Sequence, residues 1–420
     1  MLIGFQWGGR LNFDETLFAG GWQDKRNNFP SGANIRRAFL GFEGGVGEYL
    51  TYNLTLDFAG ANEEGQNRTV VDFEDAWINA CSEYDGPIGR ADLRVGQFTP
   101  PVSIDAWGNT GLENDNLFLE SALATTAFSI PTKALGVWFD ATAMDMFVLS
   151  AAAYHRRQNN TQFANSAASP NNYQNAGRSD RLGSSARLTF VPVHTCDTVY
   201  HLGIIGRYQA MNHKGAGGVP VFQQNLFATG PEARARNTTR LVTTGGSGAT
   251  IGGIRARSYN VVTGEALGMW GPVTVEGEYY QANVQRVPTI TDTTTRGNPR
   301  FNGWHVEGAY VLTGESRVYD FVTGTLRNPK PCDKSGAWEV AARFSFINLV
   351  DTGVNGGSEH NTTLGLRWFA NEHVSIAANY IRANIRATAV DTTGITPVVP
   401  APATPKRQLD IFGLRFAVAF

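Results

Sequence analysis

Hydrophobic and polar residues alternate along much of this chain, in segments of roughly ten residues. The last of these segments runs from Leu409 to Phe420 and reads LDIFGLRFAVAF. Its apolar positions include Phe412 and Phe416, and the positions between the apolar ones carry small residues and Arg415. Because successive side chains of a strand point to opposite faces, the segment predicts a strand with one apolar face and one face that carries an arginine.

The same alternation recurs in segments that are separated by turns and loops of very different length. The clearest of them are Tyr49–Phe58, Tyr200–Tyr208, Val273–Tyr279, Trp304–Leu312, Trp338–Phe346 and Thr362–Trp368. The compact connections, rich in Gly, Pro or Asn, are Gly44–Glu48, Asp85–Pro87, Trp270–Pro272 and Ala370–Glu372. The long polar connections, which we expect to be surface loops, are Arg156–Asp180, Met211–Gly253 and Ala387–Arg407.

Short turns at one end of the strands and long loops at the other are typical of outer-membrane barrels. A last strand that ends on an aromatic residue is typical of them as well, although a strand of a soluble sandwich would alternate in the same way. Counting strands backwards from a periplasmic Phe420 gives about sixteen, an even number, as in single-chain bacterial barrels. We therefore predict an all-β fold in which residues 1–420 form one transmembrane antiparallel β-barrel.

Composition and charge agree with this prediction. The 47 glycines, 11% aromatic residues and 17% charged residues fit a β-rich chain with many turns. No run of about 18 apolar residues is present, which argues against transmembrane helices. A net charge of −2 gives no whole-molecule reason to expect nucleic acid as a partner. The first residues lack the features of a signal peptide, so we expect an exported protein of the bacterial outer membrane whose signal is absent from this chain.

Candidate catalytic chemistry is sparse. The three cysteines form no C-x-x-C motif, so we expect free buried thiols or one periplasmic disulfide rather than a zinc site. No G-x-S-x-G motif or clustered set of metal ligands is evident. His305 shares the polar phase of its strand and is interpreted as a wall residue, as are Glu276 and Glu278. We expect no enzyme activity, no cofactor and no metal.

The strand phase opposite the apolar one collects arginines. Arginine on a lipid face costs roughly 2–4 kcal/mol at the bilayer midplane, which assigns this phase to the lumen. Guanidinium groups along a wall can guide phosphate or carboxylate anions. Carboxylates of the same phase would instead pair with them as a neutral wall, and the sequence leaves both interpretations open. The arginines are Arg37, Arg94, Arg187, Arg207, Arg343, Arg367 and Arg415, and the carboxylates are Asp57, Glu276, Glu278, Glu307 and Glu339.

The segment Thr99–Lys133 is too long for a turn and contains no clear strand. It follows a strand that runs toward the outside, so it can fold into the lumen and narrow it, or form an ordinary external loop. Its charged residues, which would then lie at the constriction, are Glu113, Asp115, Glu120 and Lys133.

A set of short stretches, taken in order, resembles the phosphate-selective porin O and P family over nearly the full chain. The stretches are Asn34–Gly44 (NIRRAFLGFEG), Tyr52–Phe58 (YNLTLDF), Leu93–Pro101 (LRVGQFTPP), Phe118–Ser121 (FLES), Gly303–Glu315, Gly336–Arg343 (GAWEVAAR) and Thr363–Trp368 (TLGLRW). Each stretch alone is a weak signal, but their order and spacing together are specific.

The resemblance implies a sixteen-stranded barrel, a homotrimer and a third loop that folds inward and constricts each pore. It also implies passive uptake of anions, which are phosphate in the best-known members. Arg36, Arg37 and Arg94 lie within matching stretches and are therefore expected to line the pore. Outer-membrane lipid and lipopolysaccharide are the expected surroundings, and small anionic or neutral solutes are the expected cargo.

This chain departs from the family where phosphate would bind. Thr99 stands where many relatives have lysine, and Lys133 is the only lysine in its segment. We therefore expect a general or weakly anion-selective diffusion porin. The alternative is a structural surface barrel, acting as a scaffold, adhesin or receptor, and conductance separates the two because a plugged barrel would pass little current.

Overall fold

The computed structural model describes most of the chain. The described residues are 4–19, 31–59, 71–84, 86–108, 112, 116–129, 133–156, 182–214, 220–222, 227–233, 242–244, 254, 256–287, 297–386 and 407–420.

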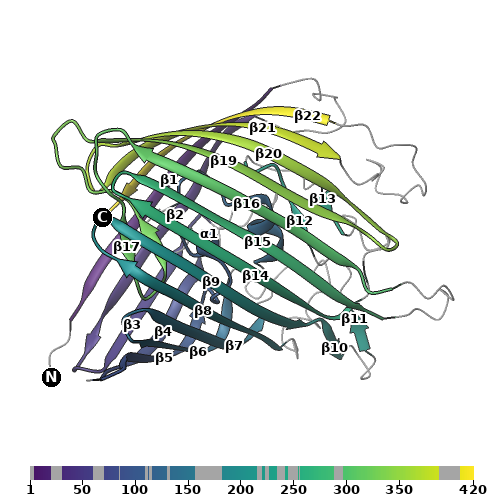
Figure 1. Cartoon of the computed structure of the whole chain (residues 1–420), viewed down its shortest axis with the longest axis horizontal. Helices are drawn as coiled ribbons and strands as arrows, with labels where there is room; N and C mark the ends of the chain where they lie inside the picture. Colours follow the sequence, from purple (N-terminus) through teal and green to yellow (C-terminus); the bar gives the residue numbers. More distant parts are fainter. Residues whose placement is uncertain are drawn as a thin grey trace.

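Sixteen antiparallel strands close into a barrel (Figure 1). Around the barrel they are β1 (Gln6–Ala19), β2 (Gly32–Val46), β3 (Leu50–Asp57), β4 (Asp72–Glu83), β5 (Ile88–Phe98), β6 (Ala134–Ala143), β7 (Phe147–Arg156), β8 (Leu182–His194), β9 (Thr198–Ala210), β14 (Ala256–Trp270), β15 (Val273–Arg286), β16 (Arg300–Val311), β19 (Ala337–Asp351), β20 (Val354–Phe369), β21 (Val374–Arg386) and β22 (Arg407–Ala419). The predicted fold class and strand number are confirmed, and each segment of clear alternation lies on one of these strands.

The first and last strands close the barrel. β1 pairs with β22 from Arg10 opposite Ala419 to Ala19 opposite Asp410. The Gly9 amide also donates to the Phe420 carbonyl at 2.8 Å. Closure pairs the backbone of every barrel strand on both sides, so the sheet has no free edge.

The two faces of the barrel differ as the alternation predicts. On β22, Phe412 is 48% exposed and Phe416 is 44% exposed, whereas Arg415 between them is fully buried. On β19, Phe344 is 56% exposed and its neighbour Arg343 is 1% exposed. Apolar side chains therefore face outward and arginines face the inside of the barrel.

Several short elements lie outside the closed sheet. They are the helices α1 (Ile104–Gly108) and α2 (Leu123–Phe128) and the two-stranded pairs β10 (Asn212–Lys214) with β11 (Pro220–Phe222), β12 (Ala228–Thr229) with β13 (Val242–Thr243), and β17 (Val318–Asp320) with β18 (Thr325–Arg327). An apolar core inside the barrel joins α2 to the inner faces of β14, β15 and β16, through residues such as Phe128, Tyr259 and Phe301. Within the described residues, no helix has the length and hydropathy that crossing a membrane requires.

The predicted long loops have different outcomes. Residues 157–180 and 387–406 lie outside the described part of the chain. The expectation of a surface loop is wrong for Met211 and for residues 227–233 and 242–244, because Met211, Phe227 and Val242 are at most 1% exposed and belong to the apolar core inside the barrel. The three cysteines are free, and Cys196 and Cys332 are exposed rather than buried.

Candidate functional site

The structure places the predicted arginines on the inner face of the barrel. Five of them, Arg187, Arg207, Arg343, Arg367 and Arg415, are between 0% and 4% exposed. They come from β8, β9, β19, β20 and β22, so the positive charges are spread around the wall rather than gathered on one strand.

A β-bulge brings both Arg36 and Arg37 into the lumen. The pairing of β1 with β2 passes from Asn12 opposite Arg37 directly to Phe13 opposite Ile35, which leaves Arg36 as the extra residue. A bulge breaks strict alternation, so two successive side chains can point to the same side. Alternation alone could assign only one of the two to the lumen.

Several inner-face arginines are neutralised by carboxylates of the wall. The Arg187 Nε lies 2.7 Å from Glu265 Oε1, and both side chains are almost completely buried. The Arg415 Nη2 lies 2.7 Å from Asp14 Oδ2 across the β1–β22 seam. These contacts are of the kind that the neutral-wall interpretation expects, but Glu265 and Asp14 are not among the carboxylates named from the sequence. Of the named ones, Glu307 lies 3.4 Å from Arg343 and Glu339 lies 2.7 Å from Arg317.

Glu120 ties the segment Thr99–Lys133 to the inner wall. Its Oε1 lies 2.7 Å from Arg36 Nε on β2 and 3.3 Å from Arg415 Nη2 on β22. Its backbone carbonyl accepts a hydrogen bond of 3.0 Å from Arg343 on β19. One residue of the segment therefore contacts arginines from three strands.

Glycines of the wall make room for this segment. A Cβ atom at Gly413 would lie 2.7 Å from the Leu119 side chain, and one at Gly41 would lie 2.8 Å from the Leu112 side chain. The absence of a side chain at these wall positions lets the segment pack directly against the strand backbone.

Hydrogen bonds to β15 hold both helices of the segment. The Ser103 hydroxyl donates to Glu278 Oε2 at 2.8 Å, and the Ile104 amide donates to Glu278 Oε1 at 2.9 Å. The Thr125 and Tyr280 hydroxyls lie 3.0 Å apart. Figure 1 shows α1 within the outline of the strands, in agreement with these contacts.

The other predicted charges of the segment have separate outcomes. Glu113 and Asp115 lie outside the described residues. The Lys133 ammonium lies 3.0 Å from Glu74 and 3.2 Å from Asp75, so it is paired with the start of β4. Burial alone would lower the pKa of Lys133, but the carboxylates of Asp75 and Glu74 outweigh it and raise that pKa.

Several inner-face arginines keep an unsatisfied donor group, and of these Arg94 and Arg207 have no ion pair within the described residues. The Arg94 guanidinium is stacked between the rings of Trp77 and Trp138, at 4.1 Å and 4.7 Å from their centroids, and its Nε has no hydrogen-bond partner. Arg207 donates from Nη2 to the Phe128 carbonyl, while its Nε and Nη1 have no partner. A buried donor without a partner is costly, so an acceptor placed beside these nitrogen atoms would stabilise them.

The hairpin of β17 and β18 was missed by sequence reasoning. Arg187 donates to the Thr323 carbonyl at 2.5 Å, and His201 Nδ1 lies 2.7 Å from the Tyr319 hydroxyl. Leu326 packs in one apolar cluster with Ile104 of α1. The only sequence signal was length, because the connection from β16 to β19 is long for the end of the barrel that otherwise has short turns.

Glu232 is another part of the interior that sequence reasoning missed. Its Oε1 accepts a hydrogen bond of 3.1 Å from the Leu123 amide, and its Oε2 lies 3.1 Å from Arg343 Nη2. It comes from a connection that the polar composition assigned to the surface.

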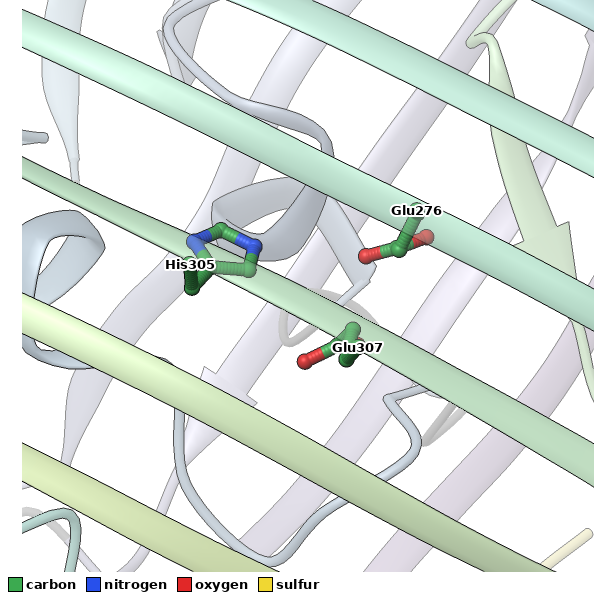
Figure 2. A group of neighbouring side chains, drawn as sticks. All are labelled: Glu276, His305 and Glu307. Atoms are coloured by element: carbon green, nitrogen blue, oxygen red, sulfur yellow. The ribbon is translucent and has the colours of Figure 1, made fainter.

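Acidic residues gather on β15 and β16. Glu276 pairs with Glu307 across the two strands, and Glu278 pairs with His305. One ligand atom each of Glu276, His305 and Glu307 lies within 4.8 Å of the others, and the three side chains are buried (Figure 2). The expectation that no clustered set of metal ligands exists is therefore wrong for these side chains. The spacing of these residues along the sequence did not indicate the cluster. They come together only through the register of β15 and β16, which a long connection joins.

Comparison with known protein families gives a match over almost the whole chain. The family described as phosphate-selective porin O and P matches residues 5–402. Porin O of Pseudomonas aeruginosa is 25% identical over 411 residues, which cover 90% of this chain and 82% of the relative. Both are channels by their descriptions.

Solved structures give the same fold. The anion-selective porin from Comamonas acidovorans superposes with a TM-score of 0.57 at 10% identity, over 100% of both chains. The trimer form of OmpT, an outer membrane protein of Vibrio cholerae, gives a TM-score of 0.53 at 11% identity, over 100% of this chain and 99% of that chain. At such low identities the likeness shows the fold alone.

Proposed function

Because this chain belongs to the phosphate-selective porin O and P family, we propose that its barrel is a diffusion channel that passes small hydrophilic solutes and prefers anions. The family and the closed barrel indicate a porin of the bacterial outer membrane. The observation that carries the anion preference is the inner face, which holds arginines with unsatisfied donor groups.

Arg94 and Arg207 are the residues that would guide an anion. Each has at least one buried nitrogen atom without a hydrogen-bond partner, and neither has a salt-bridge partner within the described residues. A permanently charged guanidinium with free donors suits phosphate, carboxylate or chloride. Arg187, Arg343 and Arg415 are ion-paired, so they contribute less net positive charge to the path.

The segment Thr99–Lys133 would constrict the pore. Its contacts with β2, β15, β19 and β22 support a position across the lumen rather than outside the barrel. Glu120 and Asp105 are acidic residues of the constriction that the structure describes, and Lys133 is paired with carboxylates. A constriction without a free lysine in the described residues favours a weak preference for anions over tight selection of phosphate.

The channel would work as a homotrimer in outer-membrane lipid and lipopolysaccharide. The trimer form of OmpT, which shares the fold, supports this assembly. The exposed aromatic and aliphatic side chains of the strands, such as Phe344 and Phe412, form the apolar outer face that lipid or a neighbouring copy would cover.

The decisive experiment is single-channel current in a planar bilayer under a KCl gradient, with phosphate added afterwards. A reversal potential that shows chloride preference is expected, and we expect Arg94→Ala to reduce it. One unit charge at about 4 Å contributes about 1 kcal/mol in water, so the permeability ratio should fall at most about fivefold.

The matched control is Arg382→Ala. Arg382 lies on the outward phase of β21, where it pairs with Asp410, so its loss removes the same charge without changing the lumen. Equal selectivity of the wild type and the Arg94→Ala variant would contradict the anion-guiding role. Block of the current by a low concentration of phosphate would indicate that the channel also selects phosphate.

One observation favours a second candidate function. The segment Thr99–Lys133 and the hairpin of β17 and β18 both contact inner-face residues, and Leu326 of one packs in a cluster with Ile104 of the other. Such filling suits a structural barrel with little conductance. Absence of current from correctly folded trimers would support that function over the porin.

A further inference from the structure

We propose that Glu276, His305 and Glu307 form a binding site for a divalent transition-metal cation of the zinc type, in the wall of the barrel. The proposal goes beyond solute diffusion, because it assigns a bound ion to the protein itself. It rests on the position of the three side chains, on the unsatisfied imidazole of His305, and on the local excess of carboxylates.

The three side chains come from adjacent strands and converge on one space. Figure 2 shows the carboxyl groups of Glu276 and Glu307 side by side, with the His305 ring beside them. Their candidate ligand atoms lie within 4.8 Å of one another. Tetrahedral zinc with bonds of about 2.0–2.2 Å needs ligand atoms about 3.4 Å apart, so side-chain rotations that shorten the distances between the ligand atoms by up to about 1.4 Å would complete the site.

His305 points to a ligand independently of the acidic residues. It is 1% exposed, and neither of its ring nitrogens has a hydrogen-bond partner. Glu278 Oε2 lies 3.7 Å from its Nε2, which is too far for a hydrogen bond. A buried imidazole without any hydrogen bond is rare, and neutral imidazole is the commonest nitrogen ligand of zinc.

Charge around the site also favours a cation. Glu276, Glu278 and Glu307 lie on the wall, and Asp105 of α1 acts on them electrostatically. Arg343 lies 3.4 Å from Glu307, but it is shared with Glu232. The carboxylates outnumber the cations, and buried carboxylates need protons or a cation to balance them.

Glu278 would support the site rather than bind the ion. Its two oxygens already accept hydrogen bonds from Ser103, Ile104 and Tyr280. Glu276, at 9%, is the most exposed of the three proposed ligands. One nitrogen and two carboxylate ligands leave a fourth position open, which water would occupy. This ligand set suits zinc better than calcium or magnesium, which prefer oxygen alone.

The test is zinc binding to the folded protein in detergent, after chelator treatment and alkylation of the cysteines. Equilibrium dialysis against zinc chloride, followed by elemental analysis, should give one bound zinc per chain. His305→Gln should weaken binding by about 10- to 100-fold, the loss that follows even from removing a partner of a ligand. Glu307→Gln should do the same and serves as the second variant if His305→Gln fails to fold.

The matched control is His360→Gln, because His360 is exposed on the outward phase of β20 and should not affect binding. Wild type without bound zinc would overturn the proposal and assign protons to the carboxylates. Equal affinity of wild type and both site variants would also overturn it. Zinc binding is measured by dialysis and channel function by current. A failure of the metal site can therefore be told apart from a failure of the porin function.

Discussion

The inner-face arginines divide into two groups by what their guanidinium groups contact. Arg187, Arg343 and Arg415 have carboxylates within salt-bridge distance. Arg94 instead lies between two tryptophan rings, which hold a cation without neutralising it. The neutral-wall interpretation describes the contacts of the ion-paired arginines, and anion guidance stays a prediction for Arg94 and Arg207.

The ion-paired group leads to a prediction about stability. Arg343→Ala would leave Glu232 and Glu307 buried without their cation, and breaking a buried pair typically costs about 3–5 kcal/mol. We expect a clear fall in the urea concentration at which the folded, heat-modifiable gel band is lost. Arg327→Ala is the control, since Arg327 is 44% exposed in its pair with Asp320 and its loss should cost about 0–1 kcal/mol. Equal midpoints for the two variants would contradict the structural role of Arg343.

At the scale of elements, the hairpin of β17 and β18 is the feature with the clearest consequence for transport. It contacts Arg187 and His201 on the inner wall. Val318 and Arg327 pair directly across it, so the chain enters and leaves the hairpin at adjacent points. It can therefore be removed without stretching the connection between β16 and β19.

We predict that replacing residues 318–327 by two glycines raises the single-channel conductance, because it removes side chains from the lumen. Arg317 and its pair with Glu339 stay in place and keep the connection anchored. The comparison variant is Asp320→Asn, which removes the charge that pairs with Arg327 but keeps a side-chain oxygen that can accept from the Val322 and Thr323 amides, so it should conduct as the wild type does. Unchanged conductance after the deletion would show that the hairpin lies outside the solute path.

The sequence predicts the strands well and the interior poorly, for a physical reason. A strand repeats every two residues, so the faces of β19 and β22 can be read from their own residues. The interior depends on contacts between distant parts of the chain. Glu120 and Arg415 are 295 residues apart, and Ser103 and Glu278 are 175 residues apart. No local pattern specifies such pairs.

The composition of loops misleads in the same way. Polar and small residues in Met211–Gly253 predicted a surface loop, yet Glu232 and Phe227 from this connection contact α2 and the inner wall. A water-filled barrel accepts polar residues inside as readily as outside, so polarity does not distinguish an external loop from one that enters the lumen.

At the scale of the whole molecule, the apolar outer face of the barrel bears on how copies of the chain assemble. A closed barrel with an apolar exterior must be covered by lipid, detergent or other copies of itself. The fold is shared with a protein solved in a trimer form.

We predict that the protein purified in mild detergent has the mass of three chains by light scattering and runs as a large species on unheated gels. Heating should convert this species to the single chain, because thermal unfolding of the barrels removes the surfaces that hold the copies together. A single-chain mass before heating would contradict the trimer, while leaving the barrel and its channel intact as properties of one chain.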